Sequence, residues 1–75
     1  MIQTVEGFNE FIVITNTDGT RDLVPKLNAN INVPTSGTAV YLQTIGVSYT
    51  IDYTTIEYPV ASSRDELAEI INSYI

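Results

Sequence analysis

The carboxylates are the first candidates for chemistry in this chain, whose 75 residues include neither histidine nor cysteine. Nucleophilic triads that need a histidine base and the usual zinc sites are therefore excluded. Asp52 and Glu57 are the two carboxylates inside the tyrosine-rich part of the chain. A catalytic carboxylate pair needs two environments that hold the pKa values apart, and the sequence gives no sign of them. We therefore expect no catalytic residue and no enzymatic activity.

Asn16, Asp18 and Asp22 surround Gly19 and faintly resemble a calcium-binding loop. In such a loop a glycine and a bidentate glutamate occupy fixed positions. Here the glycine is out of register, and the twelfth position counted from Asn16 is Leu27. A hairpin turn explains these residues better, so we predict no metal site. The glycines are too far apart to form a phosphate-binding loop, and we expect no cofactor.

The balance of charge is strongly acidic, with nine acidic and three basic residues and a net charge of −6. Arg21, Lys26 and Arg64 are scattered, whereas binding to a phosphate backbone needs clustered cations. We therefore expect no nucleic-acid or membrane partner, and no small-molecule substrate. The longest apolar run, Phe11–Ile14, is far too short to cross a membrane. The N-terminus also lacks the basic and apolar regions of a signal peptide.

The composition favours strands and association. Threonine and isoleucine occur ten times each, and both are strand formers. Only 16% of the residues are charged, so much of the surface can be buried against a neighbour without desolvating ions. A core this small often needs disulfides, a metal or oligomerisation. Because the first two are excluded, we expect stability to come partly from contacts with other subunits.

Apolar patterns predict strands along most of the chain. The expected strands are Phe11–Thr15, Arg21–Val24, Lys26–Val33, Thr38–Ile45 and Val47–Tyr53, with Ile2–Glu6 as a weaker candidate that ends at Gly7. Asp18-Gly19 predicts a hairpin turn. Phe11–Ile14 is apolar on both faces, which indicates a central strand or one covered by another subunit. A change of phase after Tyr53 predicts a bulge or turn near Thr54-Thr55.

Within the expected strand Lys26–Val33, the residues alternate between an apolar and an amide face. The apolar face contains Leu27, Ala29, Ile31 and Val33, and the other face contains Asn28, Asn30 and Asn32. The asparagines indicate either a solvated sheet face or a hydrogen-bonding ladder to a partner or glycan.

The last thirteen residues, Ser63–Ile75, are the one segment with helical periodicity. The apolar stripe contains Leu67, Ile70, Ile71 and Tyr74. Ser63 is the expected N-cap, and Glu66 three residues later completes a capping box. The stripe either covers the chain's own sheet or binds in a partner's groove.

These elements predict a single α+β domain over residues 1–75: a small antiparallel sheet of about five strands with the C-terminal helix packed on one face. The alternative is a small β-sandwich with the helix as a lid. Tyrosines cluster in the second half of the chain and are either half-buried core residues or interface anchors. The interface candidates are Phe11, Val13, Tyr41, Tyr49, Tyr53 and Tyr58.

The segment from Ser48 to Ile56, followed by Pro59, Ala61-Ser62-Ser63, Glu66-Leu67-Ala68 and Ile70-Ile71, resembles the ending of small virion proteins of tailed bacteriophages. The resemblance covers residues 40–75 and carries no catalytic or liganding residue. It implies a non-enzymatic minor capsid, cement or decoration protein that resides in the virion, and in the host cytoplasm during assembly. The implied partners are copies of itself, a larger capsid protein, or both. The alternative expectation is a small acidic protein-binding module or inhibitor of a host protein.

Overall fold

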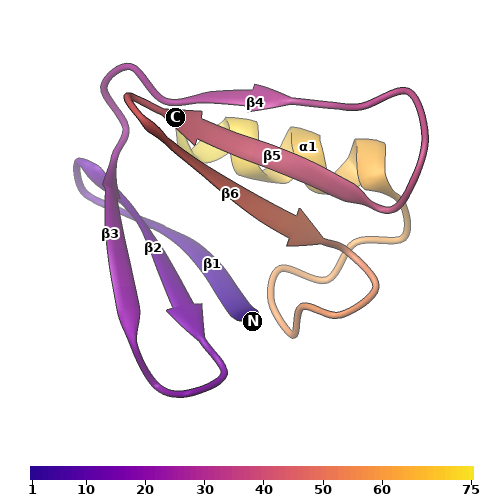
Figure 1. Ribbon diagram of the computed structural model, residues 1–75, viewed down its shortest axis with the longest axis horizontal. Coiled ribbons are helices and arrows are strands. Elements are labelled where there is room, and N and C mark those ends of the chain that lie inside the picture. Colours follow the sequence, from indigo (N-terminus) through magenta and orange to yellow (C-terminus); the bar gives the residue numbers. More distant parts are fainter.

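The computed structural model describes all residues, 1–75, as six strands and one helix. In chain order they are β1 (Ile2–Phe8), β2 (Phe11–Asn16), β3 (Arg21–Pro25), β4 (Asn30–Asn32), β5 (Ala39–Thr44), β6 (Val47–Asp52) and α1 (Arg64–Tyr74). The strands form two antiparallel three-stranded sheets, β1-β2-β3 and β4-β5-β6 (Figure 1). The predicted α+β class with a C-terminal helix is confirmed. The predicted single sheet of about five strands is not, because the chain crosses from one sheet to the other after β3.

β2 is the central strand of the first sheet, as its apolar sequence predicted. Ile12 and Ile14 are fully buried, and Val13 faces the opposite side. The turn after β2 contains Gly19 with a φ of +91°, a backbone conformation that favours glycine. The predicted end of β1 at Gly7 is wrong, because β1 continues to Phe8.

Gly7 has a packing role inside β1. A Cβ added at Gly7 would lie 3.1 Å from atoms of the Tyr74 side chain. The missing side chain therefore lets the last turn of α1 approach β1 closely.

The long strand expected at Lys26–Val33 is wrong, since only Asn30–Asn32 forms β4. Asn28 has a φ of +67°, and the N–H of Ala29 donates to the carbonyl of Lys26 over 3.1 Å, which closes a turn. This turn breaks the alternation that the sequence suggested. Leu27 is consequently 80% exposed rather than part of a buried face.

The change of phase after Tyr53 is a turn, because Thr55 donates its N–H to the carbonyl of Asp52 over 3.2 Å. The chain then returns to the first sheet. The N–H of Val5 donates to the Tyr58 carbonyl over 2.9 Å, and Thr4 forms a parallel bridge with Tyr58. The edge of β1 that does not pair with β2 is therefore covered by the chain itself.

The start of α1 is capped by serines. The Oγ of Ser63 accepts from the N–H of Glu66 over 3.1 Å, as predicted. In a standard capping box the Glu66 carboxylate would accept from the backbone N–H of the N-cap, Ser63. Here it accepts from the hydroxyl of the preceding residue, Ser62, over 2.9 Å.

One core lies between the two sheets and the helix. α1 contacts β1, β4 and β5, and it lies behind β5 in Figure 1. Leu67 and Ile71 of the predicted stripe are fully buried and Ala68 joins them, whereas Ile70 and Tyr74 are only half-buried. The buried hydrophobic residues are Val5, Ile12, Ile14, Val24, Val40, Leu42, Ile51, Leu67, Ala68 and Ile71.

Candidate functional site

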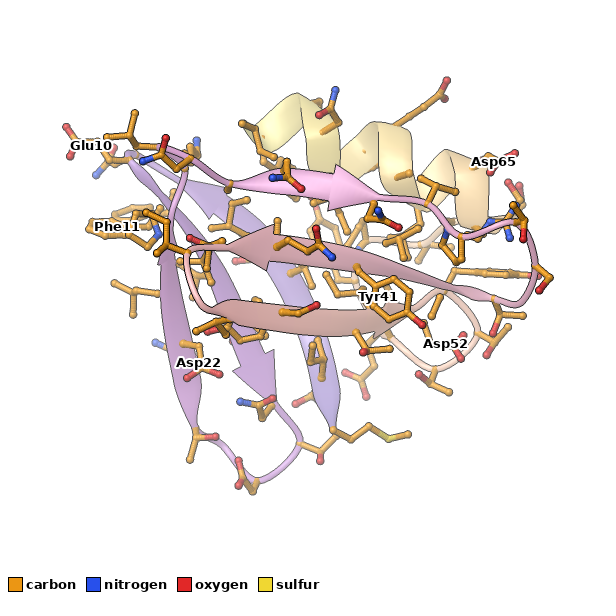
Figure 2. The ribbon with its side chains drawn as sticks, turned by 45° about the horizontal axis from the view of Figure 1, so that its top comes forward. Glu10, Phe11, Asp22, Tyr41, Asp52 and Asp65 are labelled. Atoms are coloured by element: carbon orange, nitrogen blue, oxygen red, sulfur yellow. The ribbon has the colours of Figure 1, made fainter.

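The acidic side chains do not converge on a common site. Glu10, Asp22, Asp52 and Asp65 come from different elements and point apart (Figure 2). No group of three acidic side chains is placed to hold a metal ion.

Two of the acids organise turns. Asp18 accepts from the Thr20 hydroxyl over 2.6 Å and from the Thr20 N–H over 3.0 Å. Asp52 makes the same pair of bonds with Thr54, at 2.6 Å and 2.9 Å, and also accepts from the Thr38 hydroxyl over 2.8 Å. These donors lower the pKa of both carboxyls, the threonine hydroxyl contributing most. Both carboxylates are thus engaged in local hydrogen bonds typical of Asx-type turns.

Glu57, the second residue of the carboxylate pair considered above, and Asn16 and Asp22 of the loop around Gly19 also have hydrogen-bond partners of their own. Glu57 accepts from the side-chain amide of Gln3 over 2.8 Å. The amide of Asn16 donates to the Thr20 hydroxyl over 3.1 Å and to Asp22 over 3.4 Å. The loop around Gly19 is therefore a hydrogen-bonded hairpin turn.

The six predicted interface residues do not share one surface. Phe11 and Val13 lie on the outer side of β2, away from the core. Tyr41 lies on the outer side of β5, on the face opposite the helix (Figure 2). Tyr49 and Tyr53 pack against the core, and Tyr58 is 51% exposed beside β1.

Strand register gathers Phe11 and Val13 with other apolar residues on one sheet surface. Val13 is paired with Glu6 on β1 and Leu23 on β3, and Phe11 is paired with Phe8 and Pro25. We call this surface the outer face; it consists of Thr4, Glu6, Phe8, Phe11, Val13, Thr15, Arg21, Leu23 and Pro25. Phe8 is 63% exposed and Leu23 is 57% exposed. The outer face is therefore apolar, with exposed side chains on its two edge strands and half-buried ones on the central strand.

A second apolar group adjoins the outer face at β3. Leu27 and Ile45 are each 80% exposed, and Val47 is 46% exposed. We call these three residues the edge cluster. They line one open groove of ≈ 460 Å³ together with Leu23 and Pro25, which makes the edge cluster continuous with the outer face. A monomeric protein this small rarely exposes such a contiguous apolar surface without a partner for it.

Charge is distributed unevenly over the molecule. Glu6 and Arg21 lie on the outer face, and Glu10 and Lys26 line a neighbouring groove of ≈ 800 Å³ with Phe11 and Pro25. These four charges cancel, so the net charge of −6 comes from the rest of the molecule. The apolar surface is thus bordered by balanced charge.

Sequence reasoning missed most of this surface. Alternation predicts a buried face for Leu27 and gives no separate role to Phe8, Leu23, Ile45 or Val47. The reason is that periodicity does not say which side of a sheet is covered. Two local signals do mark exposed apolar residues. Ile45 is the first residue of the two-residue turn Ile45-Gly46, and Leu27 lies two residues after Pro25, both at positions where chains usually place polar residues.

In comparisons with known proteins, no family model, no curated protein and no solved structure matches this chain. Its only helix, α1, is too short to cross a membrane. The feature of this small α+β domain that bears on function is therefore its exposed apolar surface, formed by the outer face and the edge cluster.

Proposed function

We propose that this chain is a non-enzymatic structural component of a tailed-bacteriophage particle, of the minor capsid, cement or decoration type. Its partners are copies of itself, a larger capsid protein, or both. The observation that supports this proposal is the exposed apolar surface formed by the outer face and the edge cluster. The resemblance of residues 40–75 to small virion proteins supports the phage assignment.

Burial energetics favour a permanent partner for this surface. Leaving a large apolar side chain in water rather than burying it forgoes roughly 1.5–3 kcal/mol. Several such side chains are exposed here on a chain that buries only 11 of its 75 residues. A subunit contact that covers them adds to a core that is small by itself.

The edge cluster is suited to a larger partner. It lies beside β3 and is formed by the β3–β4 loop, the β5–β6 turn and the first residue of β6. Few ions have to be desolvated there, because the groove that contains Leu27, Ile45 and Val47 is lined without a charged residue.

The test is incorporation into particles. The chain should co-sediment with particles assembled in its presence, and Ile45→Asp should abolish co-sedimentation by placing an unpaired charge in the contact. Val60→Asp is the matched control, because Val60 and Ile45 are both 80% exposed and only Ile45 is in the edge cluster. Circular dichroism should show that both variants stay folded. A folded wild-type chain that remains in the supernatant would contradict the proposed function.

A further inference from the structure

We propose that the outer face of β1-β2-β3 docks on the same face of a second copy of this chain, around a twofold axis that runs parallel to β2. This inference deepens the proposed function by naming one partner and one surface. It concerns the outer face alone; in the proposed function the edge cluster contacts a different subunit.

The pattern of charges across the outer face supports a second copy as the occupant. Glu6 is on β1 and Arg21 is on β3, so the acidic and basic residues lie on opposite edges of the sheet, with β2 between them. Neither has an ionic partner within the chain, whose one ion pair joins Arg64 to Asp65. A surface that carries both signs on opposite sides is complementary to a rotated copy of itself.

The same charges select the direction of the twofold axis. Rotation about an axis parallel to β2 places β1 of one copy over β3 of the other. Strand register then sets each Glu6 over the Leu23 of the second copy, two residues along β3 from its Arg21 and within reach of that long side chain. An in-plane axis perpendicular to the strands would instead place β1 over β1 and oppose two glutamates. In the favoured arrangement Val13 faces the Val13 of the second copy, and Phe8 and Leu23 are covered.

The balance of charge also removes an obstacle to self-association. Two molecules of net charge −6 repel each other on approach. Most of the acids that carry this charge lie on other elements, Asp52 on β6 and Asp65 and Glu69 on α1. The acids nearest to the outer face are Asp18 in the turn after β2 and Asp22 on β3, and Asp22 is paired with Ile14 on the opposite side of the sheet. The outer face itself carries one acid, Glu6, and one base, Arg21, so two copies can approach through it with little like-charge contact.

The size of the face predicts a weak, reversible dimer. Three strands spaced about 4.8 Å apart and about 20 Å long give a flat area of roughly 300 Å², against about 800 Å² per partner for a standard interface. We therefore expect dimerisation to depend on concentration and to become permanent only inside an assembly, where several contacts act together.

The test is a charge exchange between copies. Sedimentation velocity of the purified chain at about 10 µM to 1 mM, a range suited to small interfaces, should show the mass rising above the 8.3 kDa of one chain. Glu6→Lys and Arg21→Glu should each weaken self-association by about tenfold or more, because each variant opposes like charges at both symmetry-related contacts.

An equimolar mixture of the two variants should restore association, since each copy then supplies the charge that the other lost. Glu69→Lys, an exposed change of the same type on α1, should leave association unchanged. A wild-type chain that stays monomeric over this range, or a mixture that stays as weak as its components, would overturn the proposed dimer. Because this assay uses the purified chain alone, its failure would leave the particle-incorporation result of the edge cluster standing.

Discussion

The orientation of α1 leads to a sharp comparison between two adjacent isoleucines. Ile71 is fully buried among residues from both sheets, whereas Ile70 is only half-buried and is not part of the core. Replacing a fully buried isoleucine by alanine costs about 2–5 kcal/mol, because the transfer free energy is lost and a cavity remains. Both substitutions change helix propensity equally, so propensity cancels from the difference between them.

The expected magnitude is large for this chain. At about 0.05–0.15 kcal/mol per residue, a domain of this length is stable by roughly 4–11 kcal/mol. Ile71→Ala should therefore remove at least about a fifth of the free energy of unfolding, and at the upper end of the range nearly all of it. Ile70→Ala should remove about 1 kcal/mol or less, since a half-exposed side chain leaves a smaller cavity.

Urea unfolding followed by circular dichroism measures both variants against the wild type, with equal m-values as the condition for comparing them. It should be done at low protein concentration, so that self-association does not contribute to stability. Equal losses, or a larger loss for Ile70→Ala, would refute the orientation of the helix described here.

Two further predictions concern the packing of Gly7 and the turn at Asp52. Gly7→Ala should destabilise the fold by about 1–2 kcal/mol, because the added methyl group meets the Tyr74 side chain at 3.1 Å. Tyr74→Ala removes the Cγ and Cδ1 atoms of that contact, so combining the two changes should cost less than the sum of the single changes. Strict additivity in urea unfolding would argue against the contact. Asp52→Asn should flatten the pH dependence of stability in acid. The pKa of the folded carboxyl lies below its ordinary value of 3.8, mainly because of the Thr54 hydroxyl, so its stabilising effect is present at neutral pH and is lost as pH falls below about 3.8 through the lowered pKa. Thermal unfolding between about pH 2 and pH 5 measures this slope, and an unchanged slope in Asp52→Asn would contradict the assignment.

Local sequence patterns determined the elements whose formation depends on near neighbours. The Ser63 cap and the helical periodicity place α1, because capping bonds and an apolar stripe are properties of one short segment. The Asp18-Gly19 turn and the apolar strand Phe11–Ile14 were predicted for the same reason, and β2 is central as expected. The prediction of a strand over Lys26–Val33 was wrong because the alternation of apolar and polar residues continues through a turn at Asn28. The positive φ of Asn28 is set by the tertiary fold and leaves no mark in the alternation.

Tertiary structure alone decided which apolar faces are covered. Gly7 reads as a strand breaker in the sequence, yet it is the point where the Tyr74 ring approaches β1. The division into two sheets sends Val24 into the core and leaves Leu23 in solvent. Likewise, the pairing of Val13 with Glu6 and Leu23 is a property of register between strands. The sequence by itself determined that this chain lacks histidine and cysteine, and that it forms strands and one helix. Which apolar surface stays exposed depends on which face of each strand the rest of the chain covers, and that is decided by long-range packing.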